Sequence, residues 1–230
     1  LYEDSDIAAI NKPAGLVCHA GAGIRSGTLV NALLHHMGPL ETGDPQRPGI
    51  VHRLDKFTSG VMLIAKNLQA HRHLSQQFKS RAVKKEYAAL VHGKPTPPSG
   101  TIDLPLGRDP KDRKKISTRA RKSRSAITHY TVREDFGSVS LLSVRIETGR
   151  THQIRVHMAQ KGHPVVGDTV YGGDRMRSLP AKLSAALKDL QRPFLHSREV
   201  HFLHPKTGEA LSFCAPLPPE LELILSKLRQ

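Results

Sequence analysis

The chain lacks the features that would place it in a membrane, in a disulfide scaffold or at a thiolate metal site. No stretch approaches the roughly eighteen consecutive apolar residues that a membrane span needs. The two cysteines, Cys18 and Cys214, lie far apart and form no Cys-x-x-Cys pair. Tryptophan is absent, and aromatic residues make up only 4% of the chain. We therefore expect a soluble globular protein in a reducing cytoplasm.

Motifs for the common cofactors are missing as well. The sequence contains neither a Gly-x-x-x-x-Gly-Lys phosphate loop nor the glycine signature of a dinucleotide site. His152 and His157 are five residues apart on an expected helix, which turns their side chains roughly 140° away from each other. No carboxylates cluster near Asp55, as a metal-dependent nuclease would require. The sequence thus predicts no cofactor and no metal ion.

Acidic residues are scarce relative to basic ones. The chain carries 35 Lys and Arg against 20 Asp and Glu, a net charge of +15 and an isoelectric point near 10.2. Such a balance indicates a polyanionic partner, with nucleic acid first among the candidates. Residues 108–124 hold nine basic residues against two acidic ones. This segment is either a solvated, mobile loop or a loop that grips RNA by neutralising phosphates.

The length of the chain suits one catalytic domain over residues 1–230. The sequence begins at Leu1 without a methionine or a signal peptide. We therefore expect that an N-terminal segment, such as an RNA-binding domain, is absent from this chain. A monomer is expected, although the sequence leaves a dimer open.

Hydrophobic periodicity and turn residues predict an α+β fold with a mixed, largely antiparallel sheet flanked by helices. Thr151 is the expected N-cap of the helix before Gly162. Strands are expected over residues 6–12, 61–66, 85–92, 125–133, 139–147, 194–204 and 210–215, and helices over residues 29–37, 70–78, 151–161, 181–190 and 221–228.

One carboxylate lies in an unusual setting. The stretch His52-Arg53-Leu54-Asp55-Lys56 places Asp55 among cationic neighbours and runs into the apolar segment Val61–Ala65. Nearby positive charge favours the ionised form of a carboxylate, and a buried strand gives a loop a rigid support. Asp55 is the leading candidate for the reactive group. Without further motifs, it could equally cap a turn or pair with Lys56.

Four motifs in order resemble those of the pseudouridine synthases of the large-subunit ribosomal RNA type. They are Lys12-Pro13-Ala14-Gly15, His52-Arg53-Leu54-Asp55, the strand with Tyr87, and Thr148-Gly149-Arg150-Thr151-His152-Gln153-Ile154-Arg155, followed by Gly162-His163-Pro164 and Gly167-Asp168. The resemblance spans roughly residues 1–216. It implies an RNA isomerase that breaks the bond between uracil N1 and ribose C1′, turns the uracil and rejoins it through C5.

The resemblance also implies roles for single residues. Asp55 would be the essential carboxylate, acting at the ribose or at the uracil ring, and Arg155 would pair with it and keep it ionised. Tyr87 would lie against the uracil and take part in the proton transfer from C5. Arg53 would fill the space left by a flipped uridine, although a solvent-facing phosphate contact is a close alternative.

The basic segment supplies the expected RNA contacts and also the main departure from the family pattern. Relatives tend to have a Gly-Lys-Pro-Ala-like turn before residues 128–130, where this chain has Lys122-Ser123-Arg124-Ser125-Ala126. The expected RNA-binding residues are Arg113, Lys114, Lys115, Arg119, Arg121, Lys122 and Arg124. Ribosomal RNA is the expected partner, with transfer RNA as the alternative. The competing function is an RNA-binding or ribosome-assembly factor with a vestigial isomerase pocket.

Overall fold

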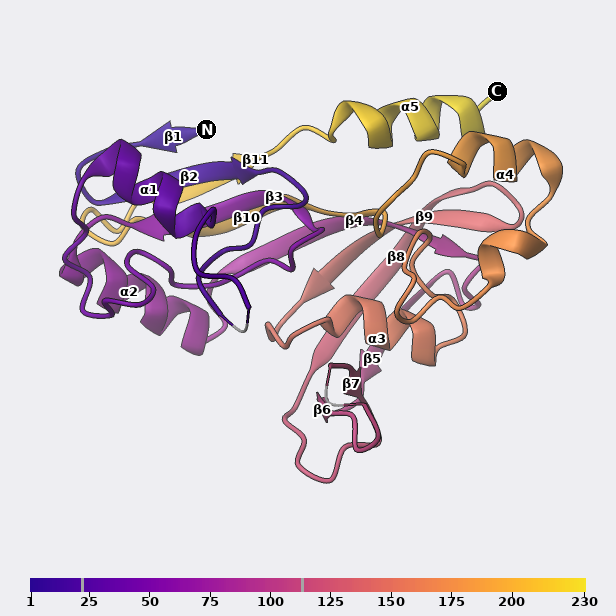
Figure 1. Ribbon diagram of the computed structural model, residues 1–230, viewed down its shortest axis with the longest axis horizontal. Helices are drawn as coiled ribbons and strands as arrows, with labels where there is room; N and C mark the ends of the chain where they lie inside the picture. Colours follow the sequence, from indigo (N-terminus) through magenta and orange to yellow (C-terminus); the bar gives the residue numbers. More distant parts are fainter. Residues whose placement is uncertain (22, 113) are drawn as a thin grey trace. The chain divides into compact units, whose positions relative to one another are not determined.

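The computed structural model describes residues 1–21, 23–112 and 114–230, which form two compact units (Figure 1). The first unit comprises residues 1–85 and 197–216, and the second comprises residues 86–196 and 217–230. We describe each unit by itself. The prediction of a single catalytic domain stays a prediction.

The sheet of the first unit is built around a fully buried strand. In order, β1 (Tyr2–Glu3), β2 (Ile7–Lys12), β3 (Ser59–Ala65) and β10 (Leu195–Leu203) lie side by side, and β11 (Ala210–Cys214) pairs with β10. β2 and β3 are antiparallel, with Ile7 opposite Ala65 and Lys12 opposite Gly60. All seven residues of β3 are buried, as its continuous apolar sequence predicts. Only the first two residues of β10 belong to the second unit.

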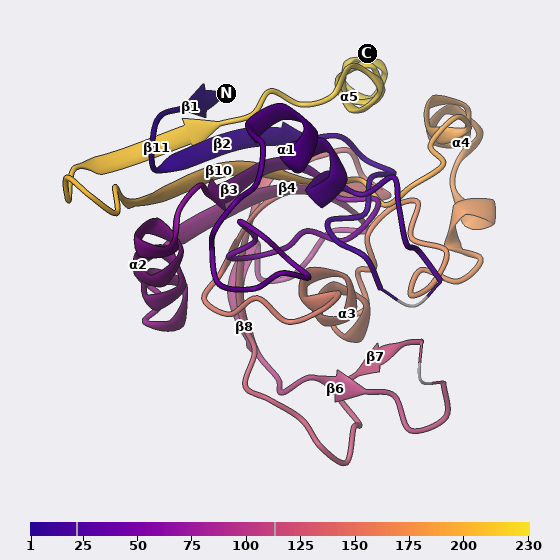
Figure 2. The same cartoon turned by 60° about the vertical axis from the view of Figure 1, so that its left-hand side comes forward.

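Two helices accompany this sheet. Helix α1 (Leu29–Met37) begins at Thr28, which forms a reciprocal capping box with Asn31. Helix α2 (Leu68–Lys79) begins at Asn67, whose side chain accepts a hydrogen bond from the backbone N–H of Ala70. Ala70 and Leu74 pack in a core cluster with strand residues such as Val61, Leu63 and Val200. This core packs α2 against the sheet, and α2 lies beside the sheet in the ribbon (Figure 2).

The sheet of the second unit is antiparallel throughout. Its order is β4 (Lys84–His92), β9 (Val139–Ile146), β8 (Ile127–Asp135) and β5 (Ser99–Asp103). A bulge between Val132 and Glu134 interrupts the β8–β9 ladder. Between β5 and β8, strands β6 (Gly107–Arg108) and β7 (Ile116–Ser117) form a small separate ladder. We call residues 107–124 the basic hairpin; in both ribbon views it extends beyond helix α3 (Figures 1 and 2).

Helices α3 (Gln153–Gln160), α4 (Ala181–Leu187) and α5 (Pro219–Leu228) complete the second unit, with a 3-10 helix at Arg175–Ser178. α4 and α5 pack in a cluster with Leu90 of β4, Val139 of β9 and the loop residue Phe194. The apolar stripe at 221, 224 and 225 is buried in this cluster, as its helical spacing predicts.

The predicted α+β class with its largely antiparallel sheet is confirmed, and two local predictions are wrong. Thr151 is not the N-cap of α3: that position is His152, in the left-handed conformation with φ 54° and without a side-chain capping bond. β5 (Ser99–Asp103) forms where no strand is predicted, because residues 95–100 are rich in the proline, serine and glycine of turns. No helix among the described residues has both the length and the hydropathy required to cross a bilayer.

Candidate active site

Two of the sequence motifs meet in the first unit. The side chain of Lys12 is fully buried at the end of β2. Its ammonium group donates to the carbonyl oxygens of Pro13 (2.8 Å), Leu16 (3.0 Å) and Lys56 (3.3 Å). The Gly15 N–H also donates to the Lys56 carbonyl, at 2.8 Å. The turn at residues 13–16 is therefore tied to the loop that carries Asp55.

The Asp55 loop is held on either side of the carboxylate. Leu54 is buried, and its carbonyl accepts a hydrogen bond from the Cys18 thiol at 3.3 Å. The Thr58 N–H donates to the Asp55 carbonyl at 3.0 Å, which closes a turn just before β3. Asp55 itself is half-buried, and Arg53 is exposed. The loop therefore presents Asp55 from a fixed backbone, as a reactive group requires.

His52 anchors the start of this loop. Its Nε2 accepts a hydrogen bond from the Leu63 N–H at 2.9 Å, and its ring stacks on Phe78 with centroids 4.6 Å apart. The Lys85 ammonium lies 5.5 Å from the centroid of the same Phe78 ring. Desolvation, and then the charge of Lys85, lower the pKa of His52 to about 3. Desolvation likewise lowers the pKa of Lys85 to about 8. His52 is therefore neutral and serves as an acceptor.

Arg155 has a defined partner within the second unit. Its Nε and Nη2 donate to the two oxygens of Asp168 at 2.6 and 2.9 Å, and both residues are buried. This side-on pair occupies the edge of the guanidinium that carries Nε and Nη2, and it fixes the orientation of the whole group. Gly167, before Asp168, has φ +78°, and a Cβ there would lie 2.2 Å from the Arg192 carbonyl oxygen. The predicted pairing of Arg155 with Asp55 stays a prediction.

Sequence reasoning missed the Asp168 partner. Asp168 was part of the motif segment after α3, but its sequence gave no sign of a contact with Arg155, thirteen residues earlier. Tyr87, the other predicted catalytic residue, is buried in β4 opposite Val144 of β9. The prediction that Tyr87 lies on a strand is confirmed, and its catalytic role stays a prediction.

Short-range hydrogen bonds shape the described part of the basic hairpin. Asp109 accepts backbone hydrogen bonds from Lys111 (2.8 Å) and Asp112 (3.0 Å), which lower the pKa of its carboxyl. Asp112 accepts one from the Lys114 N–H at 2.9 Å. The two acidic residues therefore shape the backbone. The basic side chains that we predict to bind RNA are exposed at Lys114, Lys115, Arg119, Arg121, Lys122 and Arg124, whereas Arg113 lies outside the described residues.

One group of side chains in the described part of the chain could hold a metal ion: Asp4, Asp6 and His204. Sequence reasoning missed it because His204 is 200 residues from Asp4. His204 Nδ1 accepts from the Thr207 N–H at 3.1 Å, so Nε2 carries the hydrogen that bonds Asp4 at 3.0 Å. Asp6 accepts from Asn67 at 2.8 Å. These bonds tie the N-terminal and C-terminal segments of the first unit together.

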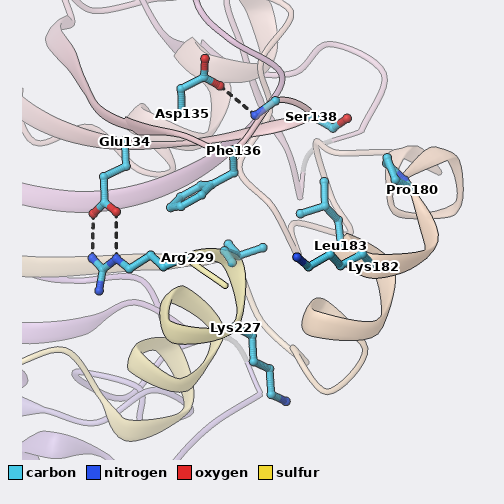
Figure 3. Close-up of a pocket in the computed structure, with 11 residues that line it drawn as sticks. Glu134, Asp135, Phe136, Ser138, Pro180, Lys182, Leu183, Lys227 and Arg229 are labelled. Atoms are coloured by element: carbon cyan, nitrogen blue, oxygen red, sulfur yellow. Dashed lines mark hydrogen bonds and ion pairs between the residues drawn. The ribbon is translucent and has the colours of Figure 1, made fainter.

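A pocket of about 740 Å³ lies in the second unit between the β8–β9 turn and helices α4 and α5 (Figure 3). On one side Arg229 donates two hydrogen bonds to Glu134, at 2.8 and 2.7 Å. Phe136 and Leu183 supply apolar surface to its lining. None of the residues predicted for catalysis or RNA binding lines this pocket, so we do not place the candidate site there.

Comparisons with known proteins point to one family. Residues 6–160 match the family model described as RNA pseudouridylate synthase. A protein of Xanthomonas campestris pv. campestris named ribosomal large subunit pseudouridine synthase D is 47% identical, over 100% of this chain and 69% of its own length. The protein of the same name from Pseudomonas aeruginosa is 46% identical, over 100% of this chain and 71% of its own.

A solved structure has the same fold. The human RNA pseudouridylate synthase domain containing 4 protein has a TM-score of 0.76 and 27% identity, with 100% of this chain and 92% of that chain covered. The chain spans between 66% and 73% of the length of the first curated relatives that it matches.

Proposed function

The chain belongs to the RNA pseudouridylate synthase family, and on that premise we propose that it isomerises specific uridines in structured RNA to pseudouridine. The observation that carries this proposal is the family match over residues 6–160, because that range contains Asp55, Tyr87 and Arg155. Relatives named ribosomal large subunit pseudouridine synthase D, at 46 and 47% identity, favour large-subunit ribosomal RNA as the substrate. Transfer RNA is the second candidate.

The reaction is a rearrangement within one nucleotide. The bond between N1 and C1′ breaks, the uracil turns, and a bond between C5 and C1′ forms. C5 loses its proton and N1 ends with one, so atoms and electrons balance within the uridine. The enzyme must then supply a group that attacks or takes a proton, a pocket for the flipped base, and a way to stabilise charge.

Asp55 is the proposed essential carboxylate, and its attack on the ribose or on the uracil ring are both open. Its fixed backbone supports this role, because a nucleophile or base acts only from a defined position. Arg155 is the proposed partner. The side-on pair with Asp168 engages Nε and Nη2, and in this proposal Arg155 also keeps Asp55 ionised during the reaction. A guanidinium can serve one carboxylate along its edge and another at its end.

Tyr87 and Arg53 complete the proposed assignment. A tyrosine can stack on a base with its ring and move a proton with its hydroxyl. Arg53 is exposed, which leaves it available to fill the stack or to contact phosphate. The exposed basic residues of the hairpin are the proposed contacts to the RNA backbone.

The test replaces Asp55 of the protein by Asn and measures the release of tritium from RNA labelled at C5 of uridine. We expect tritium release from transcribed large-subunit ribosomal RNA to fall by about 10³-fold or more, because the amide can neither attack nor accept the proton. RNA affinity should stay within about threefold of the wild type. The matched control is Asp189→Asn, an exposed carboxylate after α4, which should keep full activity.

Release by the Asp55→Asn protein at the wild-type rate would refute the role of Asp55. A wild-type protein that binds RNA tightly and releases no tritium would favour the alternative, an RNA-binding or assembly factor with a vestigial pocket. Comparing ribosomal with transfer RNA in the same assay decides between the two substrate classes.

A further inference from the structure

Tyr171 joins the basic hairpin to the helix that carries Arg155. Its hydroxyl oxygen accepts a hydrogen bond from the Ile116 N–H of β7 at 2.9 Å. The same oxygen lies 2.8 Å from Nδ1 of His152, the N-cap of α3. The Arg155 guanidinium carbon lies 5.1 Å from the centroid of the Tyr171 ring. One side chain therefore contacts the hairpin, the start of α3 and Arg155.

The backbone of Tyr171 is fixed by the carboxylate that grips Arg155. Asp168 Oδ1 accepts from the N–H groups of Val170 and Tyr171, at 3.0 and 3.1 Å. The same oxygen accepts from Arg155 Nη2 at 2.9 Å. The backbone of Tyr171 and the guanidinium of Arg155 are therefore bonded to the same carboxylate oxygen. A displacement of Tyr171 should displace Arg155 as well.

His152 strengthens this link, because its backbone is strained. A histidine at φ 54° is in the left-handed region, which a side chain adopts only when its surroundings hold it there. Its ring meets Tyr171 edge to face, with centroids 5.6 Å apart. The Tyr171 contact holds His152 at the start of the turn that bears Arg155.

Other contacts attach the hairpin to α3 without reaching Arg155. His157 Nε2 bonds the carbonyl of Leu104, just before the hairpin, at 2.9 Å, and the Thr118 hydroxyl in the hairpin donates to Gln160 Oε1 at 3.3 Å. Leu106 and Val156 form a small apolar cluster against which Ile116 and Tyr171 pack. Tyr171 differs from these contacts in that it touches the hairpin and Arg155 together.

We propose that Tyr171 is a positioning residue that couples RNA binding at the basic hairpin to the placement of Arg155. The inference rests on the proposed function for its catalytic consequence. RNA bound to the basic side chains displaces β7. The hydrogen bond from the Ile116 N–H then transmits this displacement to the Tyr171 hydroxyl. The ring of Tyr171 and its Asp168 anchor then set Arg155. Correctly docked RNA thus completes the site, whereas free protein leaves Arg155 less sharply placed.

The test begins with Tyr171→Phe, which keeps the ring under Arg155 and removes the hydroxyl that bonds Ile116 and His152. We expect the single-turnover rate at saturating enzyme to fall about tenfold, with RNA affinity changed less than threefold. The variant Arg119→Ala, Arg121→Ala, Lys122→Ala should also lower this rate. Combined with Tyr171→Phe it should lower the rate no further, because both changes break the same link.

The matched control is Tyr130→Phe. The Tyr130 hydroxyl donates to the Pro97 carbonyl at 3.2 Å in the same unit, and its ring contacts Lys161 at the far end of α3 from His152. It should leave the single-turnover rate within twofold of the wild type. Additive losses in the combined variant, or an equal loss in Tyr130→Phe, would overturn the coupling.

A second measurement is independent of catalysis. In hydrogen exchange followed by mass spectrometry, the segment around Ile116 should exchange at least about tenfold faster in free Tyr171→Phe than in the wild type. On adding transcribed large-subunit ribosomal RNA, the first turn of α3 should gain protection in the wild type and not in the variant. Unchanged exchange at both places would overturn the inference even in an active enzyme. Wild-type protein that shows this exchange pattern and releases no tritium would contradict the proposed function alone.

Discussion

Lys85 holds a charge where charge is unfavourable. Its side chain is buried beside Phe78 and the neutral His52, and desolvation lowers its pKa to about 8 from 10.5. Between pH 8 and 10.5 the unfolded chain binds a proton at this lysine that the folded protein lacks. Stability therefore falls as the pH is lowered through this window, and the whole penalty is present at pH 7. The contact with the Phe78 ring offsets part of it.

Replacing Lys85 by Met should therefore stabilise the protein at neutral pH. We expect the free energy of unfolding at pH 7 to rise by about 1–3 kcal/mol, with the gain shrinking toward pH 10.5. Urea unfolding at pH 7 and at pH 10 measures both values. Lys84→Met is the control, because Lys84 is exposed on the same strand. Equal effects of the two substitutions would contradict the desolvation argument.

At the scale of elements, removing positive charge from the basic hairpin should have the largest effect on RNA binding. Replacing Arg119, Arg121 and Lys122 by Ala should weaken RNA binding and reduce the slope of log affinity against log salt by about one unit per lost phosphate contact. Filter binding between 50 and 300 mM salt gives the slope. Replacing Lys182, Lys188 and Lys227 by Ala removes the same charge elsewhere in the second unit. If both triple variants flatten the slope equally, net charge rather than the hairpin governs binding.

Elements with a strong local signal were predictable from the sequence. The apolar run of β3 indicates a buried strand, and Asp135 with Gly137 indicates the β8–β9 turn. The sequence offers Ser26 or Thr28 as the start of α1, and the N-cap is Thr28. The Asp135 side chain accepts from the Gly137 N–H at 2.9 Å, so a contact between near neighbours in the sequence helps to close the β8–β9 turn. Such patterns need no knowledge of distant contacts.

Elements that depend on distant partners were not predictable. β5 begins among proline, serine and glycine residues, and its pairing with β8, 28 residues away at Thr101 and His129, makes it a strand. At the start of α3, buried Gln153 rather than Thr151 makes the side-chain hydrogen bonds. Its Oε1 accepts from the Arg150 N–H at 3.0 Å, and its Nε2 donates to the Ile127 carbonyl at 2.9 Å. For the candidate site, the motifs indicated the residues, but the Lys12 contacts and the Arg155–Asp168 pair required the folded chain.

At the scale of the whole molecule, the net charge of +15 implies a polyanionic partner without naming it. The relatives point to ribosomal RNA. We expect that cells lacking the gene lose pseudouridine at one or a few uridines of large-subunit ribosomal RNA and keep all sites of transfer RNA. Mapping pseudouridines at nucleotide resolution in total RNA measures this. The signal should return with the wild-type gene and not with Asp55→Asn; a loss confined to transfer RNA would reassign the substrate.

The hydrogen bonds of Lys12 link the turn at residues 13–16 to the loop that carries Asp55. An ammonium group has three protons, and those of Lys12 go to the carbonyls of Pro13, Leu16 and Lys56. Because the side chain is also fully buried, Lys12 is part of the interior of the first unit and not of its surface charge. Lys12 also connects two segments that lie 44 residues apart. An insertion or deletion in either segment should therefore shift the backbone of both the proline turn and the Asp55 loop.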